Sequence, residues 1–420
     1  MFIERLQLTN FRGFEEIDLH FTGRTTVLIG ENGAGKSAIL DALLQLLRPL
    51  PRMFRAELEG SYPIDSSLWT IAPIDRRNNT DRTRLALTVR TEGLPAGIWA
   101  MDTEPVKDHQ KHQRKLFWVL YERGDGGGSE LPTFAYYPVD RQVTSGLARE
   151  PGPLDDAVIA FKSFEQGRSD YDQLFNWFRS REDIENESLR DDSRFRDPQL
   201  SAVRRALESL VPGFENLRVR RVPSAGGPFS YFKRPVLLVD KGDTTLAVDQ
   251  LSHGERGLIA LVGDLTRRLA LTHPNLADPL QGDGIALIDE LALHLHPRWQ
   301  RDILPALERT FPNLQFIVTT HSPQVIANVD RSNVRVLEDN RLISDAPHTY
   351  GRDANAILSD LMGLEPHPVS TRASLRTIAE MIDSEDYDAA RDALDNLAES
   401  LGENDVTIVH QRSLLELLAE

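Results

Sequence analysis

The stretch TTVLIGENGAGKSAILDALLQLL, residues 25–47, decides the fold of this chain. Its first five residues are apolar or β-branched and predict a buried strand, whereas SAILDALLQLL places apolar side chains at helical spacing. The loop between them is rich in glycine, so its backbone N–H groups can turn inward around an anion, and the helix N-terminus adds partial positive charge. Strand, loop and helix in this order predict a phosphate-binding loop.

Two side chains at the end of this loop have specific expected roles. Lys36 would reach the β- and γ-phosphates of a nucleotide, and Ser37 would ligate Mg²⁺. The glycines let the backbone approach the phosphates closely. The positions expected to contact the nucleotide are Gly30, Asn32, Gly33, Gly35, Lys36 and Ser37.

A second group of polar side chains follows two apolar strands later in the chain. GIALIDE at 284–290 ends in Asp289 and Glu290, and QFIVTTHS at 315–322 carries His321 near its end. The carboxyl ends of parallel strands are where α/β sheets place ligands. We expect Asp289 to hold Mg²⁺, Glu290 to act as a general base on the attacking water, and His321 to hydrogen-bond the γ-phosphate or that water. The alternatives are a helix N-cap for the acidic pair and a structural role for the histidine.

The rest of the chain is organised around these motifs. Helices alternate with short apolar strands after Ser252, which predicts a parallel sheet covered on both faces. A charged helical region lies between 150 and 210. Further strands are expected at 2–9, 25–29, 83–90, 116–122, 134–141 and, in short pieces, 216–248. The expected units are an N-terminal lobe with the phosphate-binding loop (1–149), a helical lid or short arm with return strands (150–235), a C-terminal lobe (236–345) and a helical acidic tail for partner binding or oligomerisation (346–420).

The segment LSHGERG, residues 251–257, precedes an apolar helix. A phosphate-binding loop, a distant LSxGE, a strand ending in Asp-Glu and a Thr-His-Ser strand, in this order, resemble the ATP-binding-cassette ATPases. The resemblance implies an α/β head with a mixed, largely parallel sheet, an antiparallel β subdomain, a helical insertion, and ATP with Mg²⁺ as ligands. It also implies that Ser252, Gly254 and Glu255 belong to a signature motif that completes the site of a second copy. Two chains would then sandwich two ATP molecules, and assembly beyond a dimer stays open.

Two further segments narrow this resemblance. IERLQLTNFRGF at 3–14, with GENGAGKSAILDAL, looks like the RecF/SMC-type branch, in which Arg12 would approach the nucleotide. DELALHLHPRWQ resembles overcoming-lysogenization-defect and antiphage ATPases, and we interpret His294 and His296 as part of a dimer contact rather than as a zinc site. YYPVDRQV at 136–143 occupies the place of the glutamine loop, which in that family links the nucleotide to the helical lobe. The resemblance implies that either Gln142 or Arg141 has this role.

The broadest resemblance is to the ATPase subunit of Septu-type and retron-associated antiphage systems. It is carried by FNWFRSREDIENE, LSHGERGLIALVGDL, LIDELALHLHPRWQ, VTTHSPQVI and YGRDANAIL. In those systems the partner is an HNH endonuclease, so the resemblance implies an ATPase that controls a separate nuclease. Beyond His321 the sequence shows no convincing cluster of nuclease carboxylates. We therefore expect an ATP hydrolase without a nuclease domain of its own.

Composition and charge limit the remaining possibilities. The chain has no cysteine, which excludes disulfides and thiolate zinc sites, and no apolar run approaches the length of a membrane span. Charges interrupt the N-terminal apolar residues, which does not match a signal peptide, so a cytoplasmic protein is expected. A net charge of −16 does not attract DNA overall, so any nucleic-acid contact would be local, through RSRE at 179–182, RR at 204–205 or RVRR at 218–221.

Two alternative functions follow from these observations. The first is a RecF/SMC-like ATPase that binds DNA directly in repair or genome maintenance, using the local basic clusters. The second is a nucleotide-gated scaffold with little turnover, against which the intact Asp-Glu pair argues. A transporter cassette fits the amino-terminal pattern least.

Overall fold

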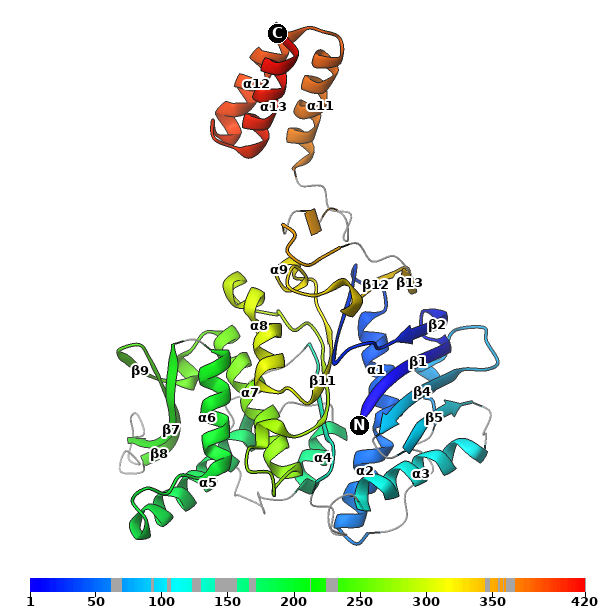
Figure 1. Cartoon of the computed structure of the whole chain (residues 1–420), viewed down its shortest axis with the longest axis vertical. Coiled ribbons are helices and arrows are strands. Elements are labelled where there is room, and N and C mark those ends of the chain that lie inside the picture. The colour runs from blue at the N-terminus through cyan, green and yellow to red at the C-terminus, as the bar shows by residue number, and fades with distance from the viewer. Residues whose placement is uncertain are drawn as a thin grey trace. The chain divides into compact units, whose positions relative to one another are not determined.

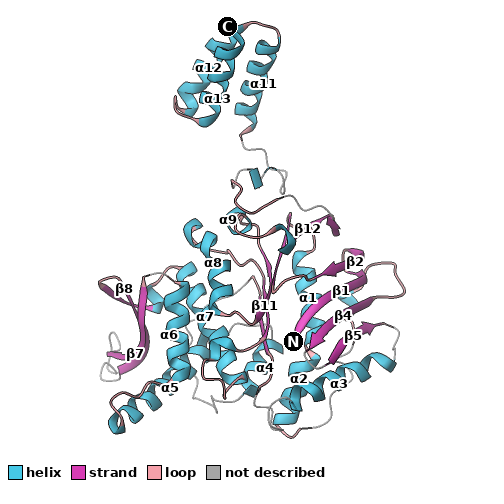
Figure 2. Cartoon of the chain, in the orientation of Figure 1, coloured by secondary structure: helices cyan, strands magenta, loops and turns pink. Residues whose placement is uncertain are grey.

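Figures 1 and 2 show the computed structural model of the chain. Two compact units divide it, Met1–Ala354 and Asn355–Glu420. All three β-sheets of the described residues lie in the first unit. The structure describes residues 1–61, 70–91, 94–103, 107–122, 130–139, 157–165, 171–211, 213–223, 233–343, 348–353, 356–357, 359 and 367–419.

The phosphate-binding loop follows a central strand of a six-stranded sheet. Its strand order is β13-β12-β3-β11-β10-β6, in which only β13 runs antiparallel to its neighbour. Every residue of β3, β6, β10 and β11 is buried, as parallel strands with both faces covered require. The strands are β3 (Thr25–Gly30), β6 (Thr133–Tyr137), β10 (Gly284–Ile288), β11 (Leu314–Thr319), β12 (Val334–Glu338) and β13 (Arg341–Ile343). The predicted α/β fold with a mixed, largely parallel sheet is confirmed.

Helix α1 (Lys36–Leu47) covers one face of this sheet and packs against a second, antiparallel sheet. It contacts β3, β10 and β11 on one side and β4 and β5 on the other. Its apolar stripe shares one buried cluster with alternate residues of the central strands, among them Leu28, Ile285 and Ile317. The antiparallel sheet has the order β2-β1-β4-β5, with β1 (Phe2–Phe11), β2 (Phe14–His20), β4 (Arg84–Thr91) and β5 (Leu94–Asp102).

Helices α6, α7 and α8 lie on the other side of β11 from α1 (Figure 2). Among them α7 packs against β6, and α6 packs against both α7 and α8. A small antiparallel sheet, β7-β8-β9, contacts α5 and α6 through β7. The bounds are α2 (Pro49–Leu58), α4 (Ala157–Glu165), α5 (Tyr171–Asp191), α6 (Pro198–Leu210), β7 (Phe214–Pro223), β8 (Lys233–Lys241), β9 (Thr244–Ala247), α7 (His253–Thr272), α8 (Pro297–Thr310) and α9 (Pro323–Ile326).

One expected strand is wrong. Residues 116–122 form the end of helix α3 (Lys107–Glu122). The apolar run LFWVLYE fits either period, but its buried residues Leu116, Phe117 and Leu120 are spaced as on one helix face. The preceding KDHQKHQRK is rich in good helix formers and extends the helix backward. Phe117 also stacks on Tyr121 one turn later, with ring centroids 5.7 Å apart.

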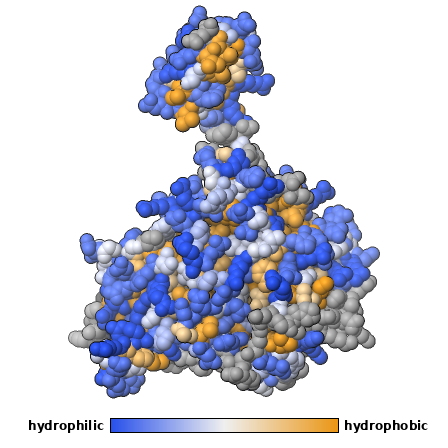
Figure 3. Space-filling view, in the orientation of Figure 1, coloured by the Kyte–Doolittle hydropathy of each residue, from blue (hydrophilic) through white to orange (hydrophobic). Residues whose placement is uncertain are grey.

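The second unit is a bundle of three helices with its own core. The helices are α11 (Val369–Asp383), α12 (Tyr387–Leu401) and α13 (Val406–Ala419). Ile378, Leu394 and Ile408 are almost fully buried in a cluster that contains only residues of these helices. In the described part of the chain no helix is long and apolar enough to cross a membrane. Most of the face visible in Figure 3 is hydrophilic, in keeping with the high charge.

Candidate active site

The loop between β3 and α1 adopts a conformation that needs glycine. Gly33 and Gly35 have φ of 85° and 99°, in the left-handed region. A Cβ on Gly35 would lie 3.0 Å from Cε2 of Phe14 and would clash with the ring edge. Gly35 is also the residue that immediately precedes the first turn of α1. The N-terminus of this 12-residue helix therefore opens directly onto the loop, as anion binding requires.

Lys36 lies inside the loop rather than in solvent. Its Nζ donates hydrogen bonds to the carbonyl oxygens of Gly30 at 3.0 Å and Glu31 at 2.9 Å. Burial lowers the pKa of Lys36, and the nearby carboxylates of Glu290 and Asp289 oppose that shift. The ammonium group is therefore within electrostatic range of both acids at the end of β10.

Thr319, the last residue of β11, orients the acidic pair. Its hydroxyl donates to Oδ1 of Asp289 at 2.5 Å and accepts from the backbone N–H of Glu290 at 2.7 Å. The N–H of Asp289 donates to the carbonyl of Tyr137 on β6 at 2.8 Å. Glu290 has φ of 49°, a left-handed conformation that is uncommon outside glycine. Thr319 is not among the residues expected from the sequence, although its place two residues before His321 in TTHS could have indicated it.

His321 faces the general-base candidate. Its Nε2 lies 3.2 Å from Oε1 of Glu290, and the imidazole is 34% exposed. Burial lowers the pKa of His321; Glu290 and Asp289 act against that shift, whereas Lys36 reinforces it. A neutral imidazole can either donate or accept one hydrogen bond at Nε2. The structure thus brings Lys36, Asp289, Glu290 and His321 together.

The donors around Asp289 fit a hard divalent cation such as Mg²⁺. Asp289 is buried, and the described residues provide a hydrogen bond to its Oδ1 but none to its Oδ2. Ser37 is exposed at the start of α1 and its hydroxyl has no hydrogen bond within the described residues. No group of three or more His, Asp or Glu side chains in the described part of the chain could hold a metal. Mg²⁺ here would therefore need phosphate oxygens or water as further ligands, which is its usual mode of binding.

Ser252 and Glu255 form a reciprocal cap at the start of α7. The Ser252 hydroxyl donates to Oε2 of Glu255 at 2.8 Å, and the Ser252 N–H donates to the same oxygen at 2.9 Å. Oε1 of Glu255 accepts from Nζ of Lys241 at 2.6 Å. No hydrogen bond or ion pair joins residues 251–257 to residues 30–37, both of which the structure describes in full. Glu255 thus orients Ser252 within its own chain.

Gly254 packs against the segment that follows the acidic pair. A Cβ on Gly254 would overlap the carbonyl oxygen of His294 and would lie 3.0 Å from its carbonyl carbon. His294 has φ of 61°, and its ring centroid is 6.4 Å from that of His253. His296 caps α8 by accepting from the N–H of Arg298 at 3.2 Å. The signature-like loop and the HLHP segment therefore form one continuous surface.

Arg12 lies on the tight turn between β1 and β2, with φ of 50°. Its guanidinium is paired with Asp41 on α1 at 2.6 Å and with Asp75 at 2.8 Å. The structure thus places Arg12 beside α1 but engages its charge with two carboxylates. Gln142 and Arg141 lie outside the described residues.

Four of the seven arginines in the three basic clusters pair with carboxylates, and Arg220 and Arg221 are exposed. In RSRE, Arg181 pairs with Asp197 at 2.5 Å, and Arg218 of RVRR pairs with Asp240 at 2.8 Å. The remaining pairs are Arg204 with Glu185 at 3.0 Å and Arg205 with Asp278 at 2.6 Å.

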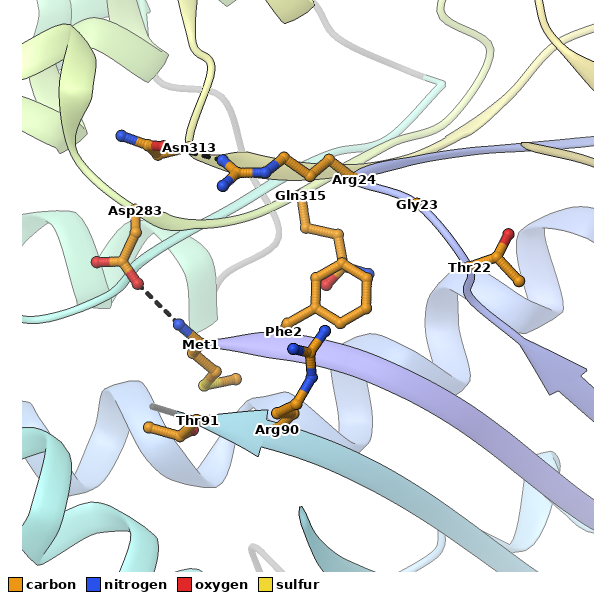
Figure 4. A pocket seen from close by; sticks show the side chains of 10 residues that line it. All are labelled: Met1, Phe2, Thr22, Gly23, Arg24, Arg90, Thr91, Asp283, Asn313 and Gln315. Carbon is orange, nitrogen blue, oxygen red and sulfur yellow. Dashed lines mark hydrogen bonds and ion pairs between the residues drawn. The ribbon is translucent and has the colours of Figure 1, made fainter. Parts of the chain in front are cut away.

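A hollow of about 740 Å³ lies at the opposite end of the sheet (Figure 4). Arg24 and Asp283, which line it, immediately precede β3 and β10, so it opens at the amino ends of the parallel strands. The amino group of Met1 pairs with Asp283 at 2.8 Å within it. The acidic pair and His321 lie at the carboxyl ends, so this hollow is separate from the candidate active site.

Comparisons with known proteins show the family to which this chain belongs. Residues 25–327 match a family model described as "AAA domain, putative AbiEii toxin, Type IV TA system". The chain is 28% identical to the Retron Ec83 probable ATPase of Escherichia coli, over 98% of this chain and 86% of that protein. It is 25% identical to the Septu protein PtuA of Bacillus mycoides (strain KBAB4), over 81% of this chain and 41% of that protein. The predicted resemblance to retron and Septu ATPases is confirmed.

Among solved structures, a crystal structure of the SmcHead bound to the C-winged helix domain of ScpA is similar. The TM-score is 0.46 and the identity 16%, over 82% of this chain and 97% of that one.

Proposed function

Because this chain belongs to the AAA-domain family of ATPases, we propose that it hydrolyses ATP in a Mg²⁺-dependent reaction at the carboxyl ends of β3, β10 and β11. The observation that supports this site is the convergence of Lys36, Glu290 and His321. Glu290 lies 3.2 Å from His321, and its carboxylate shifts the pKa of Lys36 from across the loop. Three groups from three separate segments meet where a triphosphate would end.

Each side chain has a distinct proposed role in the reaction. Lys36 exchanges its two carbonyl partners for the β- and γ-phosphates, which costs little because the ammonium already points into the loop. Glu290 accepts the proton of the attacking water, and His321 positions that water or the γ-phosphate. Ser37 and Asp289 would hold Mg²⁺, which neutralises charge on the phosphates when it is bound.

We further propose that Ser252 and Gly254 act on the nucleotide of a second copy. Ser252 is exposed at the N-terminus of a 20-residue helix, where an anion is favoured, and it is not bonded to its own phosphate loop. Glu255 and Lys241 hold the hydroxyl in place from within the chain. The ATP-sandwiched dimer would therefore contain two composite sites.

A mixing experiment tests the composite site. Lys36→Ala removes the phosphate contact of one chain, and Ser252→Arg blocks the contribution to the partner; each variant alone should hydrolyse ATP at a small fraction of the wild-type rate. A heterodimer of the two contains one intact composite site, so mixing should restore activity. If both groups acted within one chain, the mixture would stay as inactive as its components. Ser188→Arg, on α5, serves as the matched control for the added arginine.

We propose that this ATPase controls a separate HNH-type nuclease in antiphage defence. The support is the similarity to a retron probable ATPase and to a Septu protein along most of this chain. In the domain organisation proposed above, the acidic tail from residue 346 is available for a partner or for assembly beyond a dimer. Affinity purification of the tagged protein from its host, with and without Glu290→Gln, tests this. A stoichiometric nuclease whose retention changes in the variant is expected; recovery of recombination proteins or DNA alone would contradict the proposal.

The geometry weakens the DNA-binding alternative, because it engages part of the basic clusters within the chain. Arg181, Arg204, Arg205 and Arg218 are paired with carboxylates inside the chain, whereas Arg220 and Arg221 are exposed. A cation that is already paired releases few counterions on meeting a phosphate backbone.

A further inference from the structure

The turn between β12 and β13 reaches the phosphate-binding loop. Asp339 and Asn340 form this turn in left-handed conformations, with φ of 47° and 59°. The side-chain amide of Asn340 lies against two glycines: a Cβ on Gly13 would lie 2.8 Å from its Nδ2, and a Cβ on Gly35 would lie 3.0 Å from its Oδ1. Asn340 thus occupies the space between the β1–β2 turn and the phosphate loop.

The order of the strands sets the direction in which a nucleotide lies. Asp289 and His321 follow β10 and β11, which are on one side of β3, and β12 is the neighbour on the other side. The γ-phosphate end of the substrate belongs with the acids and the histidine. The nucleoside end must therefore extend from the loop toward β12 and the turn at residues 11–14, where Asn340 lies.

The two polar side chains on that side, Arg12 and Asn340, differ in whether they already have partners within the chain. The guanidinium of Arg12 is engaged by Asp41 and Asp75. Asn340 is half-buried, and none of the described residues forms a hydrogen bond with its amide. An asparagine amide carries two N–H donors and a carbonyl acceptor, and leaving these unused in a partly buried position is costly. A ligand that arrives from the phosphate loop would supply the missing partner.

We propose that Asn340 is a nucleotide-specificity residue whose side-chain amide hydrogen-bonds the nucleoside half of bound ATP. This inference rests on the proposed function, since it takes the phosphate loop as the ATP site. It adds a contact from a turn that lies more than three hundred residues after the loop in the sequence, and it assigns a role to the β12–β13 turn.

The test compares two glycine variants of the same turn in the full-length chain. Asn340→Gly removes the amide and keeps the left-handed backbone accessible. Asp339→Gly makes the same backbone change at the neighbouring residue, which is exposed. Affinities for ATP, 2′-deoxy-ATP, GTP and inorganic tripolyphosphate are measured calorimetrically in a Glu290→Gln background, which prevents turnover. Asn340→Gly should lower the affinity for ATP by about 3- to 10-fold, which corresponds to the loss of one hydrogen bond. The affinity for tripolyphosphate should not change.

Each result decides the question. A selective loss for ATP in Asn340→Gly but not in Asp339→Gly supports the contact; equalised ATP and GTP affinities then assign it to the base, and equalised ATP and 2′-deoxy-ATP affinities to the ribose. Equal weakening of ATP and tripolyphosphate would show that Asn340 only shapes the loop, and unchanged affinities would show that it is idle; both overturn the proposal. Failure of the parent chain to bind ATP would instead refute the proposed function.

Discussion

Two features position the acidic pair at the end of β10: the hydroxyl of Thr319 and the left-handed backbone of Glu290. The Thr319 hydroxyl donates to the Asp289 carboxylate and accepts from the backbone N–H of Glu290, so it fixes one carboxylate and the backbone of the other residue. The backbone conformation of Glu290, with φ of 49°, turns its side chain toward His321. Such strained positions persist where the surrounding structure over-determines them and often occur at active sites.

Glu290→Gln should abolish turnover and retain ATP binding. The amide keeps the size and the hydrogen-bonding reach of the side chain but cannot accept the proton of water, so kcat should fall by about 10²- to 10⁴-fold. The measurement is single-turnover hydrolysis alongside calorimetric binding of ATP. Glu308→Gln, an exposed carboxylate on α8, is the matched control and should behave as wild type. Hydrolysis at the wild-type rate in Glu290→Gln would exclude Glu290 as the base.

The titration of His321 should report its neighbours. Burial lowers its pKa, Glu290 raises it and Lys36 lowers it. NMR titration of labelled histidine should therefore give a pKa below the ordinary value in the parent chain, a lower one still in Glu290→Gln, and a higher one in Lys36→Met. The opposite order of the two variants would contradict the geometry.

The lowered pKa of His321 also makes the stability of the folded chain depend on pH. Because the folded-state pKa is lowered, the unfolded chain binds this proton at a higher pH than the folded chain does. Between the two pKa values the unfolded state carries more protons, so the contribution of His321 to folding weakens as pH falls. The unfolded resonance of His321, followed in urea at the same temperature, provides the reference titration.

At the scale of elements, α7 joins the signature-like loop to the rest of the site. Its first turn touches the HLHP segment through Gly254, and its middle carries a buried ion network in which Asp264 pairs with Arg267 at 2.7 Å and Arg268 at 2.6 Å. The hydroxyl of Tyr137 donates to Asp264 at 3.1 Å, while the carbonyl of Tyr137 accepts from Asp289. One residue of β6 therefore connects the helix with the acidic pair.

Gly254→Ala and Gly257→Ala, one turn of α7 apart, should have opposite effects. A Cβ on Gly254 would collide with the backbone of His294, whereas a Cβ on Gly257 would meet nothing within 4 Å. Gly254→Ala should lower the free energy of unfolding by about 1–3 kcal/mol and reduce ATP turnover. Gly257→Ala should stabilise by about 0.5–1 kcal/mol, because alanine loses less backbone entropy in a helix. Urea unfolding and steady-state hydrolysis measure both, and a neutral Gly254→Ala would refute the close packing.

At the scale of the molecule, the chain consists of two units with separate cores. The core of the second unit contains only residues of α11, α12 and α13. The first unit contains all the residues proposed for ATP hydrolysis within one copy. Loss of packing in the tail should therefore leave the nucleotide site intact.

Leu394→Ala tests this separation in the full-length chain. Leu394 is fully buried in the tail core, so its truncation should destabilise that unit by about 2–5 kcal/mol. Hydrogen exchange should quicken across residues 367–419, while ATP affinity stays unchanged. Leu417→Ala is the control, because Leu417 on α13 is 75% exposed. A matching loss of protection around β3 and β10 would show that the two units unfold together.

The sequence by itself determined the features that are contiguous along the chain. Strand, glycine loop and helix at 25–47 specify their own conformation, because the hydrophobic period and the left-handed glycines act between near neighbours. The apolar strand ending in Asp289 and Glu290 and the reciprocal cap of Ser252 and Glu255 are local for the same reason. The α/β fold and the ATPase family followed from these motifs.

Only the tertiary structure decided what depends on residues far apart in sequence. Thr319 directs Asp289, Asn340 lies between Gly13 and Gly35, and carboxylates pair with four arginines of the basic clusters. Residues 116–122 form a helix, although an apolar run of seven residues fits both the helical and the strand period. The residues around such a run decide which of the two structures it adopts. The spacing of apolar residues along the sequence indicates which faces of the helices and strands are buried. The partner of each polar group depends instead on how the sheets and helices pack together.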